Sequence, residues 1–158
     1  MSGAGAPTQN TPIDGSGLRV VVIAGTWHET ISNGLITGAQ RVLDAAGAAH
    51  TLVRVPGSFE LAVAAQAAFA GGADAVVALG VIIRGGTPHF EYVSAATTDG
   101  LSRVALDAGK PVGFGVLTLD DEQQGLDRAG LAGSKEDKGA EAADAALRTA
   151  HVVRTLRG

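Results

Sequence analysis

The chain has 158 residues, a length that fits one domain able to bury roughly 70% of the surface that its unfolded form exposes. The formal net charge is −4 and the 12 lysines and arginines are scattered, which argues against nucleic-acid and membrane binding and favours a small-molecule partner. Cysteines and long apolar runs are absent, which excludes disulfides, thiolate chemistry and a membrane span and fits a cytoplasmic location.

The first segment, residues 1–17, is rich in glycine, serine, threonine and proline and shows no hydrophobic periodicity. Such a composition buries too little apolar surface to order itself. We therefore predict a mobile N-terminal tail, held only if a neighbouring chain contacts it, followed by one folded domain over residues 18–158.

Two strand–helix units are predicted at the start of the folded domain. A β-branched run from Leu18 to Ala24 is typical of a strand that is buried on both faces. Apolar residues at helical spacing predict a helix that opens at residues 26–29 and runs to about Ala46. The next strand is expected from His50 to Val55, and an apolar helix from Phe59 to Ala70 follows a Pro-Gly-Ser break.

The same alternation continues along the rest of the chain. The segment from Asp74 to Ile83 predicts a third strand, and the helix after it extends to about Ala108. Three more elements are expected: a strand over 110–117, a helix over 120–128 and a helix over 134–156. Ser134 and Asp137 are rival N-caps of the last helix. Four strands alternating with helices predict an α/β fold, a single-domain three-layer sandwich with a four-stranded parallel sheet and helices on both faces.

The turn after the third strand carries the most specific chemistry. Gly85 and Gly86 offer backbone freedom, Thr87 can act as an N-cap, and Pro88 fits the first position of a helix. Unpaired N–H groups at the positive end of a helix dipole form a site for phosphate or another anion. His89 lies beside that site and is able to take or give a proton near pH 7. The alternative is a capped helix whose histidine is merely exposed.

Four other candidate motifs are excluded or disfavoured by their details. The segment from Gly80 to Thr87 has Gly86 where a nucleotide-binding P-loop needs lysine, and Gly113-Phe114-Gly115 follows the wrong strand for a dinucleotide fingerprint. The histidines lack ligand spacing, which leaves no predicted metal site and makes His28, His50 and His151 surface residues. The acidic run at residues 120–122 is more typical of a helix start than of paired catalytic carboxylates.

Loops that follow parallel strands open at the same edge of a sheet, so four loops should surround one crevice. These loops are residues 25–28, 56–60, 85–89 and 114–120. The crevice would offer Trp27 for stacking on a planar heterocycle, Glu60 for holding hydroxyl groups, an anion-binding turn and His89. No nucleophile or redox residue stands out.

Five pieces of the sequence together carry a family resemblance. They are Ala78–Val93, Pro56–Glu60, Phe114–Thr118, Gln123–Gly130 and Lys138–Gly139. These pieces occur in the order and at the spacing of the 6,7-dimethyl-8-ribityllumazine synthase family of riboflavin biosynthesis, which the chain from about Leu18 onward resembles. The resemblance implies a flavodoxin-like sheet and a transferase that needs no cofactor. It also implies the condensation of 5-amino-6-(D-ribitylamino)uracil with 3,4-dihydroxy-2-butanone 4-phosphate, with release of phosphate and water.

The resemblance also implies a role for each matching residue. Trp27 would stack on the pyrimidine ring, whose edge would meet the backbone of Val81, Ile82 and Ile83. The ribityl chain would be held by Ser58, Phe59 and Glu60. Phosphate would be bound by Gly85, Gly86, Thr87 and Arg128, and His89 would be the catalytic proton carrier. Phe114, Lys138 and Arg128 would come from the adjacent subunit, with Phe114 and Lys138 contacting the pyrimidine or ribityl part.

An assembly follows from the same resemblance. The implied homo-oligomer is a ring of five with active sites shared between adjacent subunits, and the sequence leaves open whether rings build a sixty-subunit icosahedral shell. Riboflavin synthase is a candidate partner. Gly86 is smaller than the residue often found at its position in the family, and Ser94 stands where some members carry cysteine.

Two other classes of protein remain as alternatives. A non-catalytic flavin-binding or lumazine-binding homologue would share the sheet and the stacking ring, but it would not need His89 or Arg128. A shell-forming homologue would share the assembly and would need neither the crevice nor the histidine.

Overall fold

The structure is a computed structural model that describes residues 4–7 and 11–158. Within these residues one parallel sheet has the strand order β2-β1-β3-β4. The strands are β1 Arg19–Gly25, β2 Ala49–Val55, β3 Ala75–Ile83 and β4 Val112–Leu119. The order matches the flavodoxin-like arrangement, in which the connection reverses between β1 and β3. The predicted α/β fold is therefore confirmed.

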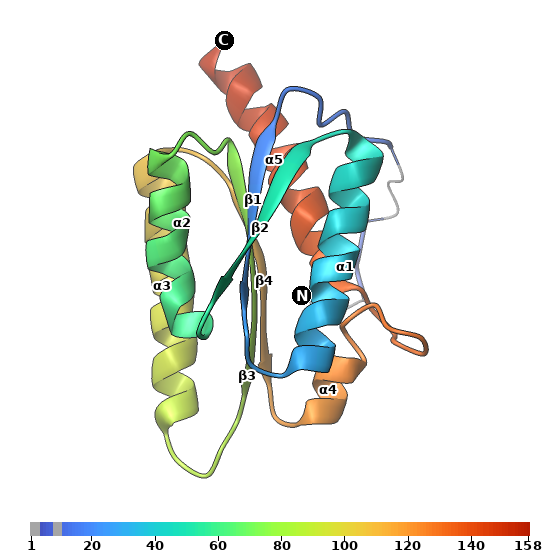
Figure 1. The fold of residues 1–158 in the computed structure, drawn as a ribbon, viewed down its shortest axis with the longest axis vertical. Helices are drawn as coiled ribbons and strands as arrows, with labels where there is room; N and C mark the ends of the chain where they lie inside the picture. Colours follow the sequence, from blue (N-terminus) through green and yellow to red (C-terminus); the bar gives the residue numbers. More distant parts are fainter. Residues whose placement is uncertain (1–3, 8–10) are drawn as a thin grey trace.

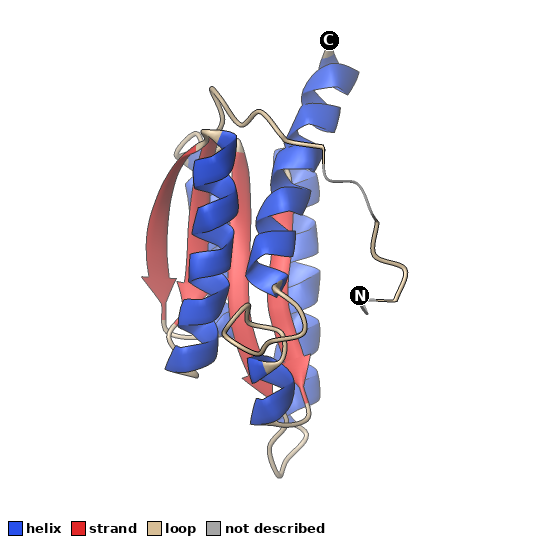
Figure 2. Ribbon diagram, turned by 90° about the vertical axis from the view of Figure 1, so that its right-hand side faces the viewer, coloured by secondary structure: helices blue, strands red, loops and turns tan. Residues whose placement is uncertain are grey.

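Helices cover both faces of the sheet (Figure 1). One face carries α1 (Glu29–Ala46), the short α4 (Glu122–Leu126) and α5 (Lys138–Arg157), and the sheet lies behind these helices in Figure 2. The other face carries α2 (Leu61–Ala70), preceded by the 3₁₀ turn η1 (Ser58–Glu60), and α3 (His89–Ala108).

The two faces bury two separate apolar cores. In β1, Val20 and Val22 belong to the core under α1 and α5, while Val21 and Ile23 belong to the core under α2 and α3. Side chains of a strand alternate between faces, so a strand that is covered on both sides needs an apolar residue at every position. This explains the unbroken β-branched run in the sequence.

The predicted ends of three elements are wrong by a few residues. The last helix begins at Lys138 instead of Ser134, because the Oδ1 atom of Asp137 accepts a hydrogen bond from the N–H of Ala140 at 3.0 Å. Ser134 holds the preceding loop instead, since its Oγ accepts from the N–H of Leu131 at 2.9 Å. Helix α4 ends at Leu126 instead of residue 128, and β4 runs over 112–119 instead of 110–117.

Helices α2 and α3 also begin differently from the prediction. The segment after Gly57 first forms the 3₁₀ turn η1, and the α-helix starts only at Leu61. Helix α3 begins at His89 with Pro88 as its capping residue. Thr87 still contributes, because its Oγ1 accepts a weak hydrogen bond from the N–H of His89 at 3.4 Å.

The segment before β1 contacts the rest of the chain where the structure describes it. Arg148 of α5 donates a hydrogen bond to the carbonyl oxygen of Thr11 at 2.9 Å, and Ile13 packs against the core under α1. Residues 1–3 and 8–10 of the predicted tail lie outside the described residues. The tail boundary at residue 17 stays a prediction. Among the described helices, none is long and apolar enough to cross a membrane.

Helices α1 and α5 pack so closely that Gly139 has no room for a side chain. A Cβ atom on Gly139 would overlap the backbone carbonyl of Leu35 in α1. We expect Gly139→Ala to lower the free energy of unfolding by about 1–3 kcal/mol, because the overlap forces the backbones apart. In an unconstrained helix the same change would raise stability by about 1 kcal/mol. Guanidinium unfolding at fixed protein concentration measures the sign, and a stabilised variant would contradict the packing.

Candidate functional site

A cavity of about 920 Å³ opens at the carboxyl ends of β1 and β3, beside α3. Three of the four predicted loops line it, through residues 27–28, residues 56–60 and three members of 85–89. Residues 81–83 of β3 and the first turns of α3 complete the wall. In open parallel sheets ligands bind where the connection reverses, and this cavity lies at that place.

The fourth loop does not line this cavity, contrary to the sequence-based expectation. Phe114 lies within β4 and is 48% exposed, and Asp120 pairs with Arg84 instead of facing the cavity. The reason is that β4 lies on the other side of β3 from β1 and β2, and that the chain leaves β4 toward α4, on the opposite face of the sheet from α3 (Figure 1).

Trp27 stands on a loop that is tied to its neighbour. The side chain of Thr26 donates a hydrogen bond to the carbonyl oxygen of Pro56 at 2.8 Å, which joins the loops after β1 and β2. Trp27 is 68% exposed and lines the cavity, so its ring is accessible for stacking on a planar ligand. His28, predicted to be a surface residue, also lines this open cavity and has a left-handed backbone with φ of 56°.

The loop after β2 brings Ser58, Phe59 and Glu60 to the cavity. The Glu60 Oε2 atom accepts a hydrogen bond from the N–H of Gly57 at 3.0 Å, so the carboxylate also shapes its own turn. Ser58 is buried, and its carbonyl oxygen accepts from the side chain of Thr97 in α3 at 3.2 Å. Phe59 is largely exposed at the cavity. These contacts fix the loop against α3.

The turn between β3 and α3 lies at the bottom of Figure 1 and is open to solvent. Gly85, Thr87 and His89 line the cavity, whereas Gly86 does not. A Cβ atom at Gly85 or Gly86 would meet no atom within 4 Å, and neither residue has a positive φ. The backbone freedom that the two glycines offer is therefore not used for a left-handed conformation here, and a larger residue would fit at position 86.

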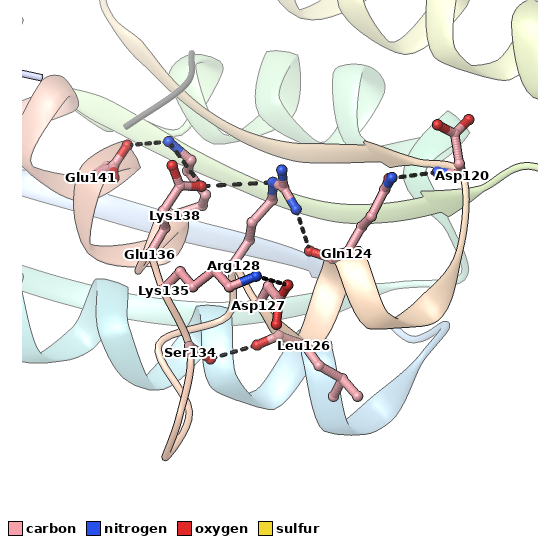
Figure 3. A network of polar contacts seen from close by, with 10 residues as sticks. All are labelled: Asp120, Gln124, Leu126, Asp127, Arg128, Ser134, Lys135, Glu136, Lys138 and Glu141. Atoms are coloured by element: carbon pink, nitrogen blue, oxygen red, sulfur yellow. Dashed lines mark hydrogen bonds and ion pairs between the residues drawn. The ribbon is translucent and has the colours of Figure 1, made fainter. Parts of the chain in front are cut away.

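Arg128 and Lys138 lie away from the cavity of their own chain, in the network of Figure 3. The Arg128 guanidinium donates to the carbonyl oxygen of Gln124 at 2.8 Å and lies 3.6 Å from a carboxylate oxygen of Glu136. The Lys138 ammonium lies 3.7 Å from the same Glu136 oxygen and 2.8 Å from Glu141. One chain therefore gathers the other predicted site residues but not Phe114, Arg128, Lys138 or Gly86.

No metal centre is apparent in residues 4–7 and 11–158, where no three histidine, aspartate or glutamate side chains gather as ligands. The polar groups at the cavity include Trp27, two histidines, Glu60, the hydroxyl groups of Ser58, Thr87 and Tyr92, and main-chain groups of the turn. Such a set can stack a ring, bind an anion and transfer protons.

Comparison with known proteins identifies the family of the chain that forms this cavity. The model of the 6,7-dimethyl-8-ribityllumazine synthase family matches residues 17–154, which include every predicted site residue. The chain belongs to this family. A protein with that name from Leifsonia xyli subsp. xyli (strain CTCB07) is 75% identical over 158 residues, which are 100% of each chain.

Other relatives of the lumazine synthase family are similar over their whole length. The synthase from Clavibacter michiganensis subsp. michiganensis (strain NCPPB 382) is 70% identical, over 100% of this chain and 99% of its own. The synthase from Nocardioides sp. (strain ATCC BAA-499 / JS614) is 62% identical, over 99% of this chain and 97% of its own. The similarity therefore covers the cavity and the loop of Arg128 and Lys138 alike.

The sequence-based prediction did not identify two arginines that lie near the cavity. Arg54 of β2 donates to the carbonyl oxygen of Gly25 at 2.9 Å and contacts Ser32 at 3.3 Å, so it holds the end of β1 from which the Trp27 loop starts. Arg84, the residue after β3, binds Glu91 and Asp120. For Arg84 the available signal was a charged residue directly after an apolar strand, whereas Arg54 lies in a strand of mixed polarity and offered no such signal.

The Arg84–Glu91 pair predicts an acid-sensitive contribution to stability. The pKa of the Glu91 carboxyl is lowered from its ordinary value of 4.5 because Arg84 donates a hydrogen bond to it. A lowered pKa in the folded state stabilises the fold above about 4.5, and this contribution is lost as the pH falls through the lowered pKa. We expect Glu91→Gln to flatten the acid branch of a plot of thermal midpoint against pH.

Glu122 provides the matched control for this measurement. It is an exposed carboxylate in the first turn of α4, as Glu91 is in the first turn of α3. Glu122→Gln should leave the acid branch as steep as in the unmodified protein. Equal flattening by both variants would assign the effect to helix dipoles instead of the Arg84 pair.

Proposed function

We propose that this protein condenses 5-amino-6-(D-ribitylamino)uracil with 3,4-dihydroxy-2-butanone 4-phosphate. The product is 6,7-dimethyl-8-ribityllumazine, with phosphate and water released, in the penultimate step of riboflavin biosynthesis. The observation that carries the proposal is one cavity, in a member of this family, that holds an exposed tryptophan ring, an open glycine turn and His89. A ligand that is aromatic at one end and phosphorylated at the other fits this combination.

The pyrimidine substrate would occupy the side of the cavity formed by β1, β2 and β3. Trp27 stacks on the pyrimidine ring, and the backbone at Val81, Ile82 and Ile83 meets its edge. The ribityl hydroxyls face Ser58, Phe59 and Glu60. The carboxylate of Glu60 and main-chain groups of the η1 turn supply the polar contacts that a polyol needs.

The phosphorylated ketone would occupy the other side, next to α3. Its phosphate binds at Gly85, Gly86 and Thr87, where the N-terminus of a 20-residue helix favours an anion. His89 is the first residue of that helix and lines the same cavity. It therefore moves protons during imine formation, phosphate loss and ring closure.

We further propose a ring of five chains in which each cavity is completed by its neighbour. Phe114, Arg128 and Lys138 lie outside the cavity of their own chain, so a neighbour has to supply them if they act in the site. The exposed ring of Tyr92 at the cavity is of the kind that subunit contacts cover. Light scattering that showed a stable monomer would contradict the ring. The sixty-subunit shell, riboflavin synthase as a partner and a cytoplasmic location stay predictions.

One incubation tests the proposed reaction. The purified protein is mixed with both substrates, and the lumazine is followed by its absorbance and fluorescence while released phosphate is measured in parallel. Omission of either substrate is the control. Equal amounts of lumazine and phosphate support the proposal. Binding of lumazine without turnover would indicate a non-catalytic binding protein, and neither binding nor turnover would indicate a shell protein.

Arg128→Ala should chiefly raise the KM for the phosphorylated ketone. A charge-assisted contact to phosphate acts in substrate binding, and its loss is expected to raise this KM about tenfold to a hundredfold. Steady-state kinetics with each substrate varied in turn measures the effect. Lys135→Ala is the control, because Lys135 lies in the same loop and pairs with Asp127. A change in the KM for the pyrimidine alone would contradict the assignment of Arg128 to phosphate.

A further inference from the structure

Arg84 holds three neighbours at once although it does not line the cavity. Its Nη1 atom donates to a carboxylate oxygen of Glu91 at 2.5 Å, and its Nε donates to a carboxylate oxygen of Asp120 at 3.1 Å. The guanidinium carbon lies 4.2 Å from the centroid of the Phe90 ring. One side chain thus joins the end of β4 to the first turn of α3.

These contacts lie on either side of the solvent-exposed turn between β3 and α3. The main-chain N–H of Arg84 donates to the carbonyl oxygen of Leu119 at 2.8 Å, which fixes the residue before the turn. Its side chain reaches Glu91, which fixes the helix after the turn. Between them, Gly85 and Gly86 have no atom within 4 Å of where a Cβ would be. The turn therefore has little packing of its own, and Arg84 connects its two ends.

We propose that Arg84 is a positioning residue that holds the phosphate-binding turn and His89 in register with β3. This inference rests on the proposed function, because that function gives the turn and His89 their roles. Arg84 acts through neighbours: Phe90 and His89 line the cavity, while the guanidinium is already engaged by two carboxylates and a ring. It is therefore not itself a ligand of the substrate.

The chemistry of the contact requires arginine. A guanidinium presents Nε and Nη1 in a fixed planar fork, so it can serve carboxylates on two different elements and still lie against an aromatic ring. A lysine at the same position would bring one point charge to Glu91 or to Asp120, but it would not hold both. Arg84→Lys should therefore restore only part of what Arg84→Ala loses.

A double-mutant cycle tests the proposal. Arg84→Ala and Glu91→Ala should each lower kcat/KM for the phosphorylated ketone by about tenfold to a hundredfold, since a small misplacement of reacting groups is costly. The KM for the pyrimidine should change little, because its side of the cavity does not depend on the turn. The kcat/KM of the double variant for the phosphorylated ketone should be no more than about twofold lower than that of the less active single variant. This is the result expected for residues that act as one unit.

The rival explanation is that Arg84 leaves its partners and binds phosphate directly. In that case Glu91→Ala would free the guanidinium, and the KM for the phosphorylated ketone would stay the same or fall. Such a result, or additive losses in the double variant, would overturn the proposal. Arg103→Ala is the control, since Arg103 forms an exposed pair with Asp107 on the same helix, and its activity should match that of the unmodified protein.

The readouts separate this inference from the proposed function and from misfolding. If the unmodified protein makes no lumazine, the proposed function fails, but calorimetry of inorganic phosphate binding still compares it with Arg84→Lys. Equal affinity in the two proteins would overturn the role of Arg84. If circular dichroism shows that Arg84→Ala does not fold, the activities of Arg84→Lys and Glu91→Gln are measured in its place. Full activity in both variants would overturn the positioning role of Arg84 as well.

Discussion

A His89→Ala variant is expected to lose a factor of about 10²–10⁴ in kcat, because a positioned acid–base group typically contributes that much. His89 lines the cavity as the first residue of α3, directly after the turn that is proposed to bind phosphate. Substrate binding should change far less than kcat, since stacking on Trp27 and the phosphate contacts do not involve the imidazole. Single-turnover kinetics together with equilibrium binding of the pyrimidine separate the two effects.

The test has to distinguish His89 from His28, because His28 lines the same cavity. His28→Asn is the matched control, since asparagine tolerates the left-handed backbone that residue 28 adopts. We expect this variant to retain most of its kcat. A larger loss at His28 than at His89 would transfer the proton-carrying role to His28. Equal losses in rate and affinity at His89 would indicate a binding role instead.

The strands were predictable from the sequence because each is a local pattern. The run from Val20 to Ala24 is apolar at every position, and burial on both faces of a parallel sheet demands that pattern. Helix boundaries were less predictable, because they depend on contacts that the local sequence does not specify. Ser134 and Asp137 are both good N-caps, and only the position of Asp137 beside the N–H of Ala140 decides between them.

The candidate site likewise has features that local sequence predicts and features that depend on contacts between distant segments. Residues 56–60 and 85–89 could be assigned to one cavity because loops after parallel strands share an edge of the sheet. Arg84 could not be recognised, because its partner Asp120 is 36 residues away and the pairing depends on β4 running to Leu119. The exclusion of β4 from the cavity likewise required the strand order, which the alternation of strands and helices leaves open.

The proposed sharing of sites between subunits has a direct test in mixed rings. His89→Ala and Arg128→Ala chains should each be nearly inactive when assayed alone at a concentration of phosphorylated ketone well below its KM. In the proposed ring, each site takes its histidine from one chain and its arginine from the next, since a heterologous contact pairs different surfaces of adjacent subunits. Sites that combine an intact His89 with an intact Arg128 therefore form only in mixed assemblies.

Random mixing makes the recovery quantitative. With equal amounts of the two chains, roughly a quarter of the sites receive both intact residues, because each is supplied with a probability of about one half. At a ratio of about one to three, the fraction falls to roughly three sixteenths, so activity plotted against composition should be a parabola with its maximum at equal amounts. Arg128 lies with Glu136 and Lys138 away from its own cavity, as this arrangement requires. Absence of recovery in rings shown to be mixed by native mass spectrometry would place both residues in one chain's site.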